Sequence, residues 1–131
     1  MKKLEVLMAL TELFDDVKAH PEVGKEIKVL ILGSGHEKEF IRLFKKQLSF
    51  AKSLGYKVIE LEQFEKLTDS PGLYSMHIES KNFNVRIIYS YYRNGELLLH
   101  CFHEEQGKSI TEYRAHIPVA VKRKKEMEGQ L

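Results

Sequence analysis

The Asn94-Gly95 pair constrains the fold of this 131-residue chain more than any other feature of its sequence. Asn-Gly between two strand-like runs favours a two-residue type I′ turn, because both turn positions need a positive φ. The runs on either side, 83–93 and 96–103, are rich in aromatic, leucine and β-branched side chains. The sequence therefore predicts an antiparallel hairpin in which the turn fixes the register.

That register decides which side chains share a face of the hairpin. With Arg93 opposite Glu96, counting outward puts Arg86 opposite His103 at the open end of the hairpin. The other pairs expected on this face are Tyr92 with Leu97, Ser90 with Leu99, and Ile88 with Cys101. We therefore expect a guanidinium and an imidazole side by side on one face of the sheet.

Two further strands are expected before the hairpin. Residues 74–79 alternate apolar and polar side chains, which is the period of a strand with one buried face. Residues 27–32 form a short run of β-branched residues and leucine that ends at Gly33-Ser34-Gly35, and we interpret it as a buried strand.

Three helices complete the expected fold. Apolar residues at helical spacing predict an amphipathic helix over 4–17 that Pro21 terminates. Ser34 and Glu37 have capping-box spacing before a second helix, which Gly55 ends. The exposed face of that helix carries a basic strip, which we take as ordinary solvated surface: Lys38, Arg42, Lys45, Lys46 and Lys52. A basic closing helix is expected over 117–127, with Pro118 near its start.

Composition narrows the class of protein. A chain that is 43% hydrophobic and 31% charged suits one globular domain over residues 1–131, and its net charge of +2 does not by itself indicate a nucleic-acid partner. No apolar run approaches the roughly 20 residues of a membrane span, and the start of the chain lacks a signal-peptide pattern. We therefore expect a cytoplasmic protein. Cys101 is the one cysteine, so neither an internal disulfide nor a thiolate metal cluster is expected.

The paired Arg86 and His103 suggest chemistry on a phosphodiester. Metal-free RNA cleavage needs a base for the 2′-hydroxyl, an acid for the leaving oxygen and positive charge for the phosphorane. We expect His77 to join the pair, because its strand leads into the same end of the hairpin. Further phosphate contacts are expected from basic residues near in sequence: Lys81, Lys108 and Arg114. The competing interpretation is that an exposed sheet edge simply carries polar side chains.

Other polar features favour structural roles. His100 is expected to be a satisfied core histidine, and the odd spacing between His100 and His103 puts them on opposite faces, so no zinc site is predicted. The glycines of Gly33-Ser34-Gly35 fit a helix cap better than a phosphate loop, because no further phosphate-loop residues follow. Cys101 is interpreted as a small buried hydrophobe.

An ordered series of segments resembles the phage-derived HigB-like branch of the RelE/ParE toxin superfamily. The segments are 64–67 (FEKL), 72–78 (GLYSMHI), 84–89 (NVRIIY) and 98–102 (LLHCF), and the resemblance covers roughly residues 58 to 125. It implies an α+β fold with helices packed on one face of a small antiparallel sheet, an additional amino-terminal helix in 1–26 and a toxin core in 27–128.

The resemblance also implies an activity and partners. It implies ribosome-dependent cleavage of mRNA without a cofactor, and neutralisation by a cognate antitoxin, expected to be of the helix-turn-helix type. Arg86 matches the family's phosphate-contacting arginine, and Asn84 matches a polar residue two positions before it. His77 stands where relatives usually carry arginine or lysine, and Lys108 matches a family lysine.

The chain also departs from the family pattern. Glu104 and Glu105 replace two lysines and would repel a phosphate, and Ile110 replaces a proline. Two alternatives therefore remain beside the nuclease. One is a ParE-like inhibitor of DNA gyrase, which needs no acid and base pair. The other is a non-catalytic, diverged toxin that acts only in a repressor complex with its antitoxin.

Overall fold

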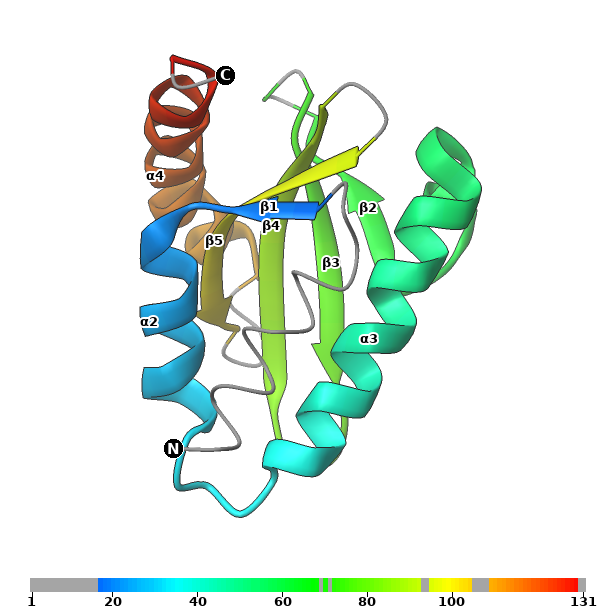
Figure 1. Ribbon diagram of the computed structural model, residues 1–131, viewed down its shortest axis with the longest axis vertical. Coiled ribbons are helices and arrows are strands. Elements are labelled where there is room, and N and C mark those ends of the chain that lie inside the picture. The colour runs from blue at the N-terminus through cyan, green and yellow to red at the C-terminus, as the bar shows by residue number, and fades with distance from the viewer. Residues whose placement is uncertain (1–16, 69, 71, 93–94, 105–108, 130–131) are drawn as a thin grey trace.

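A computed structural model of the chain describes residues 17–68, 70, 72–92, 95–104 and 109–129, and for 109–112 it describes the backbone alone (Figure 1). These residues form an α+β fold. Its elements in chain order are β1 (Val17–Ala19), α2 (Pro21–Ile31), α3 (Glu37–Leu54), the 3-10 helix η1 (Gly55–Glu60), β2 (Phe64–Lys66), β3 (Tyr74–Glu79), β4 (Asn84–Tyr92), β5 (Gly95–His103) and α4 (Ser109–Glu128). None of the helices in these ranges is long and apolar enough to cross a membrane.

The strands form one mixed sheet in the order β1-β5-β4-β3-β2. β2 to β5 are antiparallel to their neighbours, whereas β1 lies parallel to β5 along the three residues Glu96 to Leu98. The expected small antiparallel sheet is therefore present and is extended by a parallel edge strand. That edge strand begins at Val17, the last residue of the helix that was expected over 4–17.

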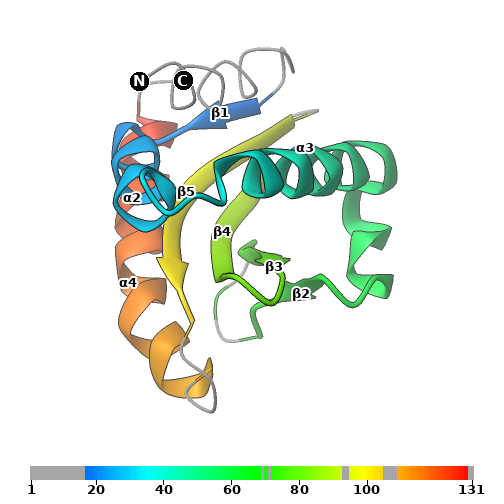
Figure 2. The same ribbon diagram turned by 90° about the horizontal axis from the view of Figure 1, so that it is seen from below.

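Helices pack on both faces of the sheet. On one face α2 and α3 cover a core that includes Phe40, Phe44 and Leu48, together with the inward side chains of β3 and β4. On the other face Ala120 and Met127 of α4 pack against Leu99 and neighbouring apolar residues. Figure 2 shows α3 and α4 on opposite sides of the strands. The expectation of helices on one face alone is wrong.

α2 replaces the strand that was expected over 27–32. Its buried residues Val23, Ile27 and Ile31 are four apart, which is the spacing of one helical face, whereas Val29 is 82% exposed. His20 caps the helix, since its Nδ1 accepts a hydrogen bond from the backbone N–H of Glu22 at 3.2 Å. The β-branched run was misleading because helical spacing across 23–31 outweighs local strand propensity.

The structure corrects the predictions for Val17 and Pro21 in the amino-terminal part of the chain. The helix expected over 4–17 lies outside the described residues except for Val17, which begins β1. Pro21 begins α2 at its first turn, a position where its missing N–H costs nothing, and it does not end a helix. The expected boundary between 1–26 and 27–128 falls inside α2. Val17 and Val23, which precede this boundary, belong to the hydrophobic core.

α3 confirms the helix that was expected after Gly33-Ser34-Gly35. Ser34 does not cap it, because His36 occupies the N-cap position and makes no side-chain cap bond. The Glu37 carboxylate instead accepts the backbone N–H of Gly33 at 2.7 Å. The loop therefore directs one of its backbone donors at a carboxylate of its own helix, and the predicted capping box of Ser34 and Glu37 is wrong.

The hairpin of β4 and β5 is confirmed, but its turn is displaced. Tyr92 pairs with Gly95, where the sequence predicted Leu97, and residues 93 and 94 between them lie outside the described ranges. This difference of two residues leaves every side chain near the turn on its expected face, because strand side chains alternate with a period of two.

A β-bulge then changes the faces further along the hairpin. Tyr89 pairs with Leu98 and Ile88 pairs with His100, so Leu99 is an extra residue on β5. From this point to the open end, the observed register differs from the predicted one by a single residue. Every β5 side chain beyond Leu99 therefore lies on the face opposite to the one expected.

The bulge separates the predicted Arg86–His103 pair. Arg86 pairs with Phe102, and His103 pairs with Val85, whose side chain belongs to the core beneath α2 and α3. Arg86 and His103 thus point to opposite faces of the sheet. The prediction that they act together is wrong.

α4 begins earlier than predicted. It starts at Ser109, so Pro118 lies inside the helix and not near its first turn. The basic character of the segment is confirmed by Lys122, Lys124 and Lys125, which lie along its carboxyl-terminal half.

Gly55 provides a test of the local backbone at the end of α3. It has φ 55° and ψ −133°, a region that side chains with a Cβ rarely adopt, although a Cβ there would meet open space. We expect Gly55→Ala to lower the free energy of unfolding by about 1–3 kcal/mol, measured by urea denaturation. Gly129→Ala is the matched control, since Gly129 has no positive φ. Equal effects of the two substitutions would contradict strain at Gly55.

Candidate functional site

The second face of the sheet carries a polar cluster centred on His77 and Arg86. These residues pair directly across β3 and β4, so the expectation that His77 lies beside Arg86 is confirmed. We call the group the His77–Arg86 cluster, and its members are Glu65 of β2, Ser75 and His77 of β3, Arg86 of β4, Glu104 after β5 and Tyr113 of α4.

Two side chains contact the His77 imidazole, and a third contacts one of these two. His77 Nε2 lies 3.0 Å from Glu65 Oε1 and 3.4 Å from the Tyr113 hydroxyl. That hydroxyl is 2.6 Å from Ser75 Oγ. The His77 side chain is 15% exposed and that of Glu65 is 45% exposed. The imidazole is therefore held between a solvent-facing carboxylate and a phenol supplied by α4.

Arg86 is buried and already neutralised. Its Nε bonds to Glu104 Oε2, and its Nη2 lies 3.8 Å from Glu79 Oε2. Only 8% of the Arg86 side chain is exposed, and Nη1 has no hydrogen-bond partner within the described ranges. A buried donor without an acceptor is costly, so Nη1 is a place where an anionic ligand would be stabilised.

Two members of the cluster have displaced pKa values. The hydrogen bond from His77 lowers the pKa of Glu65, and it outweighs the effect of burial, which acts in the opposite direction. Burial raises the pKa of Tyr113 well above its usual range, chiefly by penalising the phenolate. Glu65 is therefore a carboxylate at neutral pH, and Tyr113 keeps its proton.

The remaining predicted site residues are dispersed. Asn84 is next to the cluster, but its Nδ2 donates to the backbone oxygen of Glu104 at 3.1 Å. Lys81 is exposed in the turn between β3 and β4, and Arg114 is exposed on α4 one residue after Tyr113. Lys108 lies outside the described residues.

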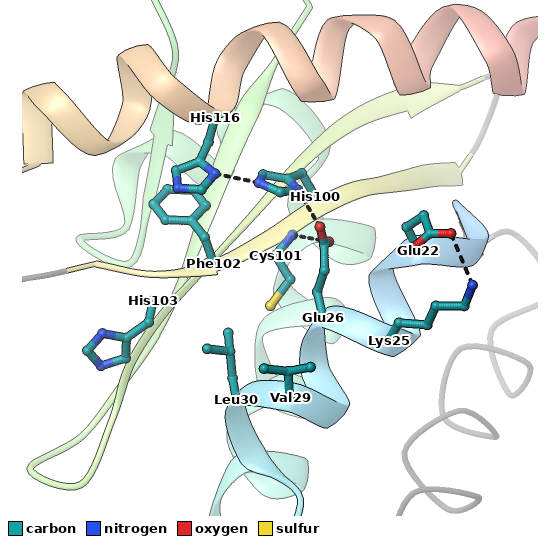
Figure 3. Close-up of a pocket in the computed structure, with 10 residues that line it drawn as sticks. All are labelled: Glu22, Lys25, Glu26, Val29, Leu30, His100, Cys101, Phe102, His103 and His116. Atoms are coloured by element: carbon teal, nitrogen blue, oxygen red, sulfur yellow. Dashed lines mark hydrogen bonds and ion pairs between the residues drawn. The ribbon is translucent and has the colours of Figure 1, made fainter.

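A second polar cluster lies where α2, β5 and α4 meet, and Figure 3 shows its members Glu26, His100 and His116. The carboxylate of Glu26 lies 2.8 Å from His100 Nδ1 and 2.9 Å from Arg123 Nη1. His100 Nε2 is 2.6 Å from His116 Nδ1, and the His116 ring stacks on Phe102 with centroids 4.1 Å apart. The cluster borders a cavity of about 500 Å³.

This second cluster caps the edge of β5 that β1 does not reach. Glu26 accepts the backbone N–H of Cys101 at 2.9 Å, and Arg123 donates to the backbone oxygen of Leu99 at 3.1 Å. Buried edge groups need such partners. His100 is thus a satisfied buried histidine, as predicted, although the bulge puts it on the face covered by α4. Cys101 is buried, and burial raises the pKa of its thiol.

No group of three or more histidine, cysteine, aspartate or glutamate side chains in the described part of the chain is arranged to hold a metal ion. The two polar clusters are therefore best described by hydrogen bonding and charge. One of them joins helices to a sheet edge, and the other combines the half-exposed Glu65 carboxylate with the buried Arg86 guanidinium.

Sequence reasoning missed Glu65, Glu104 in its role as a partner, and Tyr113. Glu65 alternates with apolar Phe64 at the start of β2, a strand too short to give a periodic signal. Tyr113 reaches the cluster across 38 positions from Ser75, and no local pattern indicates that contact.

Comparisons of the chain with protein-family models, with curated proteins and with solved structures found no match.

Proposed function

We propose that the protein is an endoribonuclease that cleaves RNA without a metal at the His77–Arg86 cluster. The observation that carries the proposal is the direct pairing of His77 with Arg86 across β3 and β4, next to the half-exposed carboxylate of Glu65. An imidazole and a guanidinium on paired residues could supply proton transfer and positive charge at one phosphodiester.

The roles within the cluster follow from its hydrogen bonds. Glu65, held as a carboxylate, orients the His77 imidazole, which accepts the proton of the 2′-hydroxyl in the proposed reaction. The Arg86 guanidinium stabilises the charge that develops on the phosphorane. Tyr113 retains its proton and, with its hydroxyl 3.4 Å from His77, is the nearest group to protonate the leaving oxygen. His103 has no part in this scheme.

The biological setting that we propose is a toxin–antitoxin pair of the RelE/ParE kind. It is supported by the ordered sequence resemblance. It is also supported by the matched residues Arg86 and Asn84, which both donate hydrogen bonds to Glu104. The target would be mRNA on the ribosome, and the inhibitor would be a cognate antitoxin. No cofactor enters the proposed chemistry.

One observation favours a second candidate, a non-catalytic toxin relative. Glu104 neutralises the arginine that a nuclease would need, and the arginine is 7% exposed. A protein that acts only in a complex with its antitoxin would tolerate this arrangement. Its expression would leave RNA intact.

The His77→Ala substitution tests the nuclease directly. We expect it to slow cleavage of a translated message by about 100- to 10,000-fold, the usual contribution of a positioned acid or base. His103→Ala is the matched control, because His103 is exposed on the opposite face. Both rates are measured in a purified translation system. Loss of cleavage in both variants, or in neither, would contradict the assignment of His77.

A further inference from the structure

Glu104 occupies the place on Arg86 that a phosphate oxygen would take. Its carboxylate bonds to Arg86 Nε, and both side chains are at least nine-tenths buried. A carboxylate and a phosphate bind the guanidinium fork in the same way, through two oxygens in one plane. The chain thus presents its own anion to the arginine that we assign to the substrate.

The backbone holds Glu104 in this position. Its N–H donates to the backbone oxygen of Asn84 at 2.9 Å, and Asn84 Nδ2 donates to the backbone oxygen of Glu104 at 3.1 Å. These bonds extend the β4–β5 ladder by one residue beyond His103. The backbone of Glu104 is therefore fixed, and its side chain is the part that can move away from Arg86.

The guanidinium is not saturated by this contact. Nη1 of Arg86 is buried without a hydrogen-bond partner among the described residues, and Glu79 approaches Nη2 only to 3.8 Å. Nε and Nη2 lie on one edge of the guanidinium, where Glu104 bonds to Nε and Glu79 approaches Nη2. Two oxygens of one phosphate could therefore bond to Nε and Nη2 together once Glu104 has moved.

We propose that Glu104 is an autoinhibitory gate: its carboxylate competes with the phosphodiester for Arg86, and RNA binds only when this side chain swings away. This inference rests on the proposed function, since it takes the Arg86 site to be the phosphate site. It also gives the acidic residue at position 104 a role, where the toxin family pattern has lysine.

The test measures binding of inorganic phosphate from the rise in unfolding temperature, at constant ionic strength. Glu104→Gln removes the competing charge but keeps the shape of the side chain. We expect this variant to bind phosphate about tenfold more tightly than wild type, comparable to one charge-assisted hydrogen bond. The gain should vanish in the double variant Glu104→Gln with Arg86→Gln.

Glu79→Gln is the matched control, because it removes a carboxylate that is near Arg86 but 52% exposed. If Glu79→Gln tightens phosphate binding as much as Glu104→Gln does, the effect is general charge and the gate is overturned. Unchanged binding in Glu104→Gln also overturns it. If Glu104→Gln does not fold, Glu104→Asp, whose shorter side chain retracts the carboxylate, should show the same direction of change, and its failure to do so overturns the gate.

RNA cleavage measured on the same variants separates the two proposals. Faster cleavage by Glu104→Gln than by wild type supports both. Tighter phosphate binding with no cleavage by wild type or variant supports an anion gate and removes the nuclease. Cleavage by wild type that Glu104→Gln does not accelerate, with unchanged phosphate binding, keeps the nuclease and removes the gate.

Discussion

Arg86→Ala is expected to lower the free energy of unfolding by about 3–5 kcal/mol, the usual cost of leaving one partner of a buried ion pair alone. The reason is that Glu104, whose side chain is 9% exposed, would remain charged in the interior without its guanidinium. The same substitution should abolish RNA cleavage. Urea unfolding measures the first effect, and primer extension on a message measures the second.

A double variant separates the loss of folding from the loss of chemistry. Arg86→Met with Glu104→Leu replaces the ion pair by apolar side chains, which is often neutral or stabilising. We expect near wild-type stability in this variant and still no cleavage. Arg114→Ala, which changes an exposed arginine on α4, should affect neither property. A folded, fully active double variant would show that Arg86 has no role in the chemistry.

Glu26→Ala is expected to destabilise the fold by about 2–4 kcal/mol at neutral pH, slightly below the range for a fully buried pair because the Glu26 side chain is 20% exposed. Its loss leaves Arg123 without its carboxylate partner and the edge N–H of Cys101 without its acceptor. Glu22→Ala is the control, since the Glu22 side chain bonds only to exposed Lys25 among the described residues. Equal destabilisation by the two substitutions would contradict the capping role of Glu26.

The contribution of Glu26 should also depend on pH. Burial raises its pKa, but the hydrogen bonds from His100, Cys101 and Arg123 outweigh burial, so the pKa in the folded state lies below 4.5. A pKa lowered on folding stabilises the protein above the unfolded value and loses that effect as pH falls through the folded one. The difference in unfolding free energy between wild type and Glu26→Gln should therefore shrink below about pH 4.5. A difference that grows on acidification would contradict this sign.

The sequence predicted the strands and helices whose periodicity is unambiguous. β3 has regular alternation, the Asn-Gly pair marks the β4–β5 hairpin, and α3 has a strong apolar face, so these elements are confirmed. α2 was missed because Ile27 to Leu32 has strand-like composition. The helical signal was nevertheless present in His20-Pro21, a cap followed by proline, and in the spacing of Val23, Ile27 and Ile31.

The site was predicted only in part for a different physical reason. Placing His77 beside Arg86 needed only that two strands share an end, whereas placing His103 needed the register to continue unbroken through β5. Leu97, Leu98 and Leu99 are three leucines in succession, which indicates burial on both faces and was the available signal that alternation breaks there. Contacts such as Tyr113 with Ser75 depend on how α4 docks and have no local signal.

Primer extension on a translated message after induced expression tests the nuclease most directly. We expect new 5′ ends within codons when wild-type protein or His103→Ala is expressed, and none with His77→Ala at equal protein levels. Intact messages in the wild-type culture would contradict it. Stalled replication in such a culture would then favour gyrase inhibition, and unaffected growth would favour the non-catalytic relative.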